Sequence, residues 1–214
     1  MRRPLKSRQA WWATALASWL ARRRVQPNTI SLMGMVFAGL GGGCLAATGV
    51  DGPLPRPLLL VLAAAMIQLR LICNLLDGMV AIEGGMKTKS GELYNDVPDR
   101  VSDPLILVGA GYGVLWGLWG PTLGWLAATL AIMTAYVRVL GVSVGTEAYF
   151  LGPMAKQHRM ATLTIACVLG AVEAVVLQPY AGVAVGLALV VIVIGSALTV
   201  GRRLRCIAAD LERQ

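Results

Sequence analysis

Long apolar stretches separated by short polar segments make up most of this chain of 214 residues. A helix needs roughly 20 mainly apolar residues to cross about 30 Å of hydrocarbon. Stretches of that kind cover residues 29–49, 58–82, 93–118, 122–145, 159–177 and 181–201, approximately. No segment alternates as a membrane barrel strand would, and a lipid-exposed backbone must satisfy its own hydrogen bonds. The pattern predicts an all-α integral membrane protein with six transmembrane helices.

The N-terminal segment has a different pattern. Within residues 5–21, Trp11, Trp12, Leu16 and Trp19 recur at helical spacing, and basic residues flank both ends. Amphipathic helices of this type lie in the membrane interface, with tryptophans at headgroup depth. We expect an N-terminal interfacial helix within residues 1–28, a six-helix transmembrane domain over 29–205 and a cytoplasmic tail over 206–214.

Composition and charge support this assignment. Hydrophobic residues make up 57% of the chain and charged residues 14%, against about 25% charged in a typical soluble domain. The net charge of +8 comes from basic residues that six spans would place on one side. They are Arg2, Arg3, Lys6, Arg8, Arg22, Arg23, Arg24, Lys87, Lys89, Lys156, Arg159, Arg202, Arg203, Arg205 and Arg213. The positive-inside rule then predicts cytoplasmic termini, and attraction to anionic lipid explains the charge without a nucleic-acid partner.

The second and third apolar stretches carry polar residues that an ordinary membrane helix lacks. A carboxylate inside a span costs roughly 2.5–3.5 kcal/mol on insertion scales, so such residues usually line a site. In the second stretch, the residues that share one helical face at its cytoplasmic end are Asn74, Asp77, Gly78 and Ala81. In the third, the residues at intervals of four are Asn95, Asp99 and Asp103. Oxygen donors on two facing helices suit a hard cation such as Mg²⁺ or Mn²⁺.

This region resembles the CDP-alcohol phosphotransferase family. The family signature is D-x-x-D-G-x-x-A-R, eight residues, then G-x-x-x-D-x-x-x-D. It aligns without a gap on Asn74, Asp77, Gly78, Ala81, Ile82, Gly91, Asn95 and Asp99. Every spacing is kept, but the first and third aspartates are asparagine and the arginine is isoleucine. The segment 27–31 also resembles the start of the family's first span, and an interfacial helix followed by six spans is the family's architecture.

The resemblance implies a reaction and a cofactor. A CDP-linked lipid or alcohol, such as CDP-diacylglycerol, binds through its pyrophosphate to Mg²⁺ or Mn²⁺, an acceptor hydroxyl attacks the β-phosphoryl group, and CMP leaves. Asp99, at the last motif position, is the expected general base. The expected metal ligands for one or two ions are Asn74, Asp77, Asn95, Asp96 and Asp99. The resemblance also implies a homodimer.

Further residues are expected to bind substrate. The small motif residues allow close approach of a ligand, and basic residues in the fourth and fifth spans indicate an anionic acceptor. The set comprises Gly78, Ala81, Gly91, Asp103, Arg138, Lys156 and Arg159. Arg70, one helical turn before Asn74, is expected either to pair with the carboxylates or to bind a lipid phosphate.

Other functions stay open at this point. The two asparagines remove two negative charges, so a relative that binds nucleotide or lipid without turnover is one alternative. A lipid-phosphate hydrolase, in which water replaces the alcohol, is another. A transporter is disfavoured, since its acidic residues usually lie near the midplane between inverted repeats. The expected location is a bacterial-type inner membrane, with the active site on the cytoplasmic side.

Overall fold

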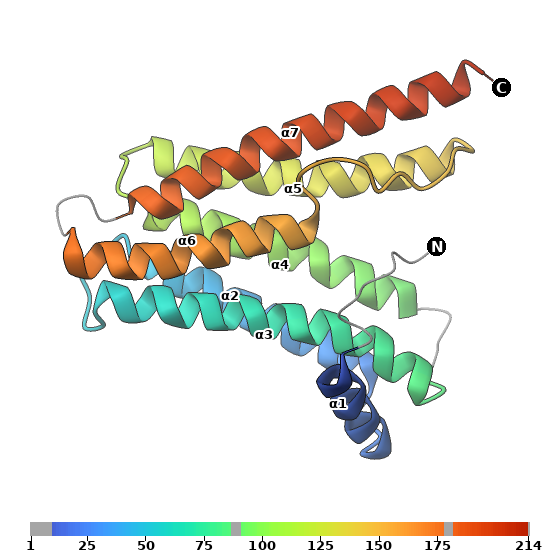
Figure 1. Ribbon diagram of the computed structural model, residues 1–214, viewed down its shortest axis with the longest axis horizontal. Coiled ribbons are helices and arrows are strands. Elements are labelled where there is room, and N and C mark those ends of the chain that lie inside the picture. The colour runs from blue at the N-terminus through green and yellow to red at the C-terminus, as the bar shows by residue number, and fades with distance from the viewer. Residues whose placement is uncertain (1–9, 87–90, 178–181, 214) are drawn as a thin grey trace.

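The computed structural model describes residues 10–86, 91–177 and 182–213, without the side chains of Glu92 and Asn95. These residues form seven α-helices and confirm the all-α class (Figure 1). The helices are α1 (Trp11–Arg22), α2 (Pro27–Ala47), α3 (Arg56–Glu83), α4 (Gly91–Gly113), α5 (Trp119–Ser143), α6 (Lys156–Val176) and α7 (Val183–Leu211). The last helix continues ten residues beyond the predicted end of the sixth span at 201, into the segment expected to be a tail.

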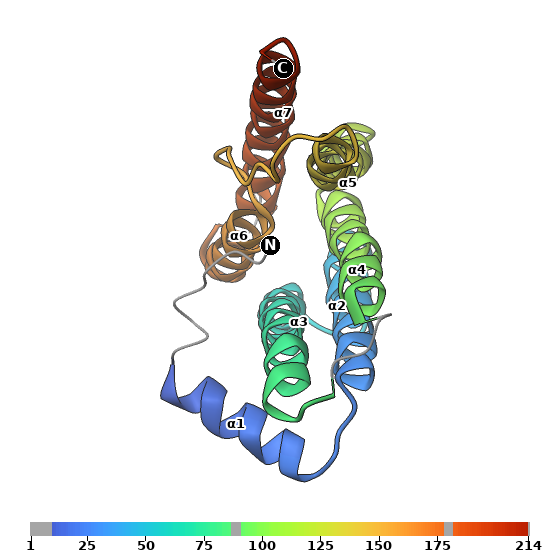
Figure 2. The same ribbon diagram turned by 90° about the vertical axis from the view of Figure 1, so that its right-hand side faces the viewer.

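Helices α2 to α7 form a closed ring, seen nearly end-on in Figure 2. Helix α2 packs between α3 and α4, α4 packs on α5, α5 on α7, α7 on α6, and α6 returns to α3. The interior contains mainly small and aliphatic side chains, such as Ala63, Ile67, Ile106, Leu163 and Leu189. The end of α3, the start of α6 and the end of α7 lie at the same end of the bundle (Figure 1).

Helix α1 lies across that end of the bundle, nearly perpendicular to the other helices (Figure 2). Ala13 and Ala17 are fully buried and pack in a cluster with Leu76 and Val80 of α3. The opposite side of α1 is open, with Trp11 81% exposed. The helix therefore buries alanine on the face toward the bundle and exposes tryptophan on the other side.

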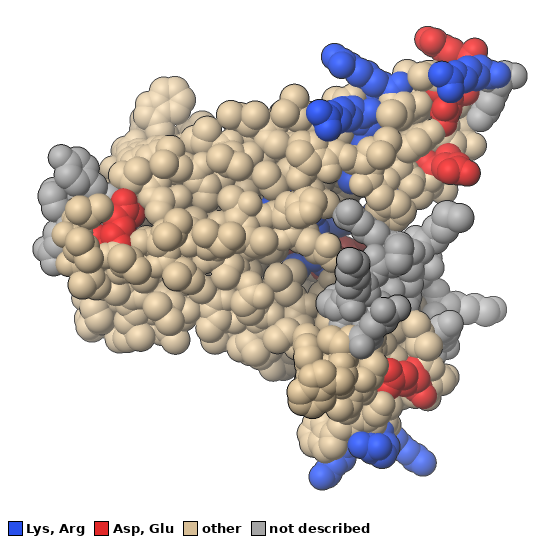
Figure 3. Space-filling view, in the orientation of Figure 1, with Lys and Arg blue, Asp and Glu red and all other residues tan. Residues whose placement is uncertain are grey.

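Five of the helices, α2, α3, α5, α6 and α7, are long and apolar enough to cross a membrane. The predicted third span corresponds to α4, which does not meet that criterion because it carries Asp96, Asp99, Arg100 and Asp103. It nevertheless lies in the ring between α2 and α5. On the face shown in Figure 3, few charged atoms lie between the two ends of the bundle, while Lys and Arg gather at the end that carries α1 and the C-terminus.

Close approach of two backbones joins α2 to α4. A Cβ atom added at Gly42 would overlap the backbone carbonyl of Leu105, and one added at Gly109 would overlap the carbonyl of Gly42. By contrast, an added Cβ at Gly39 or Gly43 would meet nothing within 4 Å. Small residues at a helix interface let two backbones approach closely. Gly42 makes such a contact with α4, whereas Gly39 and Gly43 do not.

These two neighbouring glycines provide a matched test of the α2–α4 contact. We expect Gly42→Ala to lower the free energy of unfolding by about 1–3 kcal/mol, the usual cost of overpacking. Gly43→Ala has open space around its new methyl group and should be neutral or slightly stabilising, since alanine favours helix. Thermal unfolding of both variants in detergent checks the difference. Equal melting temperatures would contradict the close contact.

Candidate active site

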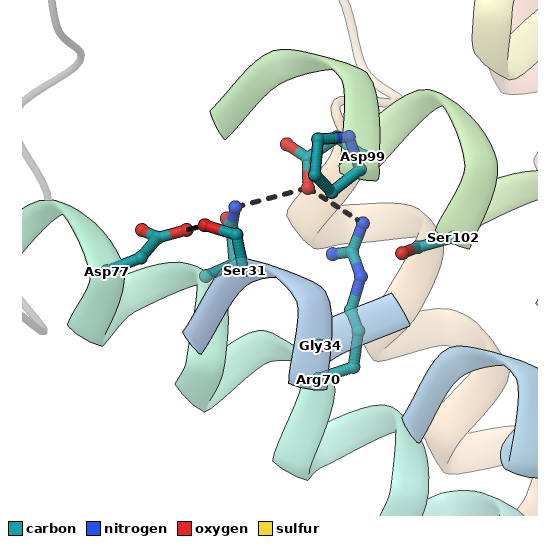
Figure 4. Close-up of a pocket in the computed structure, with 8 residues that line it drawn as sticks. Ser31, Gly34, Arg70, Asp77, Asp99 and Ser102 are labelled. Carbon is teal, nitrogen blue, oxygen red and sulfur yellow. Dashed lines mark hydrogen bonds and ion pairs between the residues drawn. The ribbon is translucent and has the colours of Figure 1, made fainter. Parts of the chain in front are cut away.

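A pocket opens where α2, α3 and α4 meet, near the end of the bundle that carries α1 (Figure 4). It is lined by Ser31, Gly34, Arg70, Asn74, Asp77, Pro98, Asp99 and Ser102. Asn74, Asp77 and Asp99 are three of the predicted site residues, and the fold brings them to this one pocket. The polar faces at the end of α3 and the start of α4 therefore meet, as the sequence predicts.

Asp77 is held by groups from α2 and from its own helix. Its Oδ2 accepts a hydrogen bond of 2.7 Å from the Ser31 hydroxyl, and its Oδ1 accepts one of 2.5 Å from the backbone N–H of Gly78. The residue is only 4% exposed. A carboxylate buried in this way requires such donors. Asp77 also lines the pocket, and Figure 4 shows it directed toward Ser31.

Asp99 accepts bonds from three side chains. Arg70 Nη2 and Asn74 Nδ2 each donate to Oδ1 at 3.1 Å, and Lys156 Nζ lies 2.5 Å from Oδ2. Lys156 Nζ also donates to Asn74 Oδ1 at 2.6 Å. Lys156 opens α6, so α3, α4 and α6 meet at this carboxylate. The side chain of Asp99 is 16% exposed and is thus accessible from the pocket.

Behind Asp99 lies a buried ion-pair chain. Asp103 Oδ1 accepts from Arg70 Nη2 at 2.6 Å, and Asp103 Oδ2 accepts from Arg159 Nη2 at 3.0 Å. The exposed fractions are 1% for Arg70, 4% for Asp103 and 3% for Arg159. The expectation that Arg70 pairs with carboxylates is confirmed. The structure places Asp103 and Arg159, both predicted to bind substrate, in the interior next to each other.

Asp96 and Arg138 lie apart from the pocket. Asp96 accepts two bonds of 2.8 Å from Arg100 on the same helix, and Arg138 Nη2 lies 3.5 Å from Asp96 Oδ1. Arg138 also stacks on the ring of Phe150, 5.4 Å from its centroid. Asp96, predicted as a metal ligand, is thus paired with arginines of α4 and α5. The side chain of Asn95, another predicted ligand, lies outside the described part of the structure.

The remaining predicted residues lie around the cluster. Gly78 contacts Asp77 through its backbone, Ala81 is one turn further along α3, and Gly91 begins α4. Ile82, at the motif's arginine position, is 53% exposed. Sequence reasoning gave no role to Ser31, which holds Asp77. A hydroxyl one turn into an apolar span was the available signal.

The donor groups of the pocket are of the kind that a divalent ion prefers. Mg²⁺ is usually bound by one or two carboxylates together with waters and substrate phosphates, and carboxylate and amide oxygens are its preferred donors. Asp77 and Asp99 supply two carboxylates from facing helices. Among the described residues, no group of three or more His, Cys, Asp or Glu side chains is placed to hold a metal ion. The oxygens of Asn74 and Asp99 both contact the Lys156 ammonium.

No protein-family model matches the chain. An uncharacterized protein of Aquifex aeolicus (strain VF5) is 27% identical over 191 residues, covering 88% of this chain and 85% of its own. Inner membrane protein YnbA of Escherichia coli (strain K12) is 25% identical over 146 residues, 66% of each chain.

Solved structures of another protein share the fold of this chain over most of its length. The crystal structure of phosphatidylinositol phosphate synthase (PgsA1) of Mycobacterium tuberculosis with CDP-DAG bound matches with a TM-score of 0.72 and 19% identity, over 92% of this chain and 94% of that one. The same protein in complex with manganese and citrate matches with a TM-score of 0.71 and 18% identity, over 91% and 88%. The predicted resemblance is confirmed at the level of fold: the chain has the fold of a CDP-alcohol phosphotransferase.

Loss of a buried ion pair and loss of an exposed one should lower the free energy of unfolding by different amounts. Arg70→Leu would leave Asp103 and Asp99 with one cation fewer in the interior, and we expect it to lower the free energy of unfolding by about 3–5 kcal/mol. Arg100→Leu removes a pair in which the side chains are 28% and 46% exposed, and should cost about 0–1 kcal/mol. Thermal unfolding in detergent compares them. Similar losses in both variants would contradict the assigned role of the Arg70 pairs.

Proposed function

We propose, from the fold that this chain shares with a CDP-alcohol phosphotransferase, that it is an enzyme of that family acting in phospholipid synthesis. It transfers the substituted phosphoryl group of a CDP-linked lipid or alcohol, such as CDP-diacylglycerol, to an alcohol acceptor and releases CMP. The observation that carries the proposal is the convergence of Asp77 and Asp99, at the family's motif spacing, on one pocket of this bundle.

The free donor groups of the pocket support a phosphate ligand. Arg70 Nη1 is buried and has no hydrogen-bond partner among the described residues, while its Nη2 is bonded to Asp99 and Asp103. In Figure 4 one nitrogen of the Arg70 guanidinium is directed away from Asp99, toward the side of Ser31. A buried N–H without a partner is costly, and a phosphate oxygen is one of the acceptors that guanidinium groups bind most strongly.

The residues of the pocket have distinct roles in the reaction. The acceptor oxygen forms a bond to the β-phosphorus of the donor as the bond from that phosphorus to the CMP oxygen breaks. Asp99 receives the proton of the acceptor hydroxyl, and Arg70 and Lys156 hold the charged phosphate oxygens. A bound Mg²⁺ or Mn²⁺, held by Asp77 and Asp99, would neutralise the pyrophosphate.

The acceptor side of the site lies toward α5 and α6. Lys156 is 22% exposed and Arg138 is 30% exposed at their side chains. Both therefore remain accessible to an anionic acceptor, such as an alcohol that carries its own phosphate. Arg159 contributes indirectly through its bonds to Asp103 and Thr134.

The same proposal includes a membrane arrangement. Helix α4 is the third of six spans, because its carboxylates pair with Arg70, Lys156 and Arg159 inside the ring. Exposed arginines at the ends of α1 and α7 support a cytoplasmic location for the pocket. Helix α1 lies in the interface with its tryptophans at headgroup depth. The relative YnbA is an inner membrane protein, which supports the same location here. The proposal also includes a homodimer as the active form.

CMP release tests the function. The purified protein is incubated with CDP-diacylglycerol, Mg²⁺ or Mn²⁺ and a panel of alcohol acceptors. We expect acceptor-dependent CMP release, and Asp99→Asn should reduce it by about 10²–10⁴-fold, as loss of a general base does. Asp51→Asn, at an exposed position before α3, is the matched control and should keep the wild-type rate.

The other outcomes separate the alternatives. CMP release that does not depend on an added alcohol would indicate a hydrolase. Binding of the CDP-lipid with no release from any acceptor would indicate a relative without turnover. Full activity of Asp99→Asn would contradict the base assignment.

A further inference from the structure

An ammonium group lies between the two motif positions that the family resemblance assigns to metal ligands. Lys156 Nζ is 2.6 Å from Asn74 Oδ1 and 2.5 Å from Asp99 Oδ2. Asn74 turns its amide so that its oxygen faces the ammonium while its Nδ2 donates to Asp99 Oδ1 at 3.1 Å. The asparagine thus acts as a neutral ligand to a side-chain cation.

The fold holds Lys156 in this place from both sides along the chain. Before it, the backbone N–H of Met154 donates to Thr199 Oγ1 at 3.0 Å, and Arg203 Nε donates to the Leu151 carbonyl at 3.0 Å. After it, Arg159 is fixed by Asp103 at 3.0 Å. The start of α6 is therefore tied to α7 and α4, and the lysine reaches the pocket from a fixed backbone.

The charges agree with this arrangement. Replacing two of the motif's four aspartates by asparagine removes as much negative charge as one divalent ion would neutralise. Among the described residues of the cluster, the three carboxylates of Asp77, Asp99 and Asp103 are matched by the three cations of Arg70, Lys156 and Arg159. A second divalent ion between Asn74 and Asp99 would meet the Lys156 ammonium at close range, and like charges at such distances repel strongly.

We infer that the Lys156 ammonium replaces one of the two divalent ions, and that the site holds at most one ion, on the side of Asp77. This inference rests on the proposed function for one point only: when the CDP-linked donor binds, the ammonium meets the pyrophosphate oxygens that a second ion would otherwise contact. Asparagine at position 74 and lysine at the start of α6 then belong together, because the asparagine removes a negative charge and the lysine takes the place of an ion.

Counting bound Mn²⁺ tests the inference without any activity. The purified full-length protein in detergent is titrated with Mn²⁺, and free Mn²⁺ is followed by electron paramagnetic resonance. We expect at most one tightly bound ion in the wild type and in Asn74→Asp. The double variant Asn74→Asp with Lys156→Met should bind one ion more, with an affinity for it roughly a hundredfold above that of Asn74→Asp alone, because a close positive charge has been removed.

Two results would overturn the inference: two tightly bound ions in the wild type, or no additional ion in the double variant that remains folded by thermal unfolding. Asn74→Asp with Lys156→Arg is the matched control, since it keeps the cation, and should bind no additional ion. The wild-type count decides the matter even if the double variant does not fold. If the Mn²⁺ counts are as expected but no acceptor supports CMP release, the result contradicts the proposed function and still supports the replacement of an ion by Lys156.

Discussion

Asp103 forms buried ion pairs with Arg70 and Arg159 in the interior of the bundle. Each of the three side chains is almost fully buried, and each would be costly alone in an apolar interior, because removing one partner leaves an uncompensated charge. Together they join α3, α4 and α6 across the ring. Helix α4, the most charged of the six, lies between two apolar helices, and its Asp99 and Asp103 are directed to these arginines.

A second constraint works with the first. The ring closes on the side of α2 and α4 because Gly42 and Gly109 let the two backbones touch, whereas Ser31 and the charged side chains of Arg70, Asp77 and Asp99 lie between the helices near the pocket. Close packing in one half of the bundle and charged groups in the other produce the opening at the end that carries α1. Van der Waals contact between small residues, rather than hydrophobic burial, drives helix association in lipid, so this closure does not require large side chains.

The sequence predicted the helices because an apolar run of about 20 residues has few alternatives in a membrane. It also predicted that Asn74, Asp77 and Asp99 meet, because helical spacing and a short connection leave the two faces little freedom. It did not predict partners that arrive from distant segments. Ser31 on Asp77 and Lys156 on Asp99 come from α2 and α6, and a serine or a lysine near a span's cytoplasmic end is equally typical of topology signals. The extension of α7 to Leu211 was missed because apolarity ends near 201 while helicity does not.

The position of Lys156 changes the interpretation of asparagine at two of the motif's aspartate positions, 74 and 95. Taken alone, Asn at two aspartate positions suggests loss of function, since the carboxylates that neutralise metal ions are gone. With an ammonium bonded to Asn74 and Asp99, the same change keeps the local charge balanced, and aspartate at position 74 would leave an excess of negative charge. The pyrophosphate of a CDP-linked donor carries two negative charges, which one divalent ion balances. A cluster that is neutral before the ion and the donor bind can therefore stay neutral with one ion and one donor bound. This balance agrees with a site that has kept its activity rather than lost it.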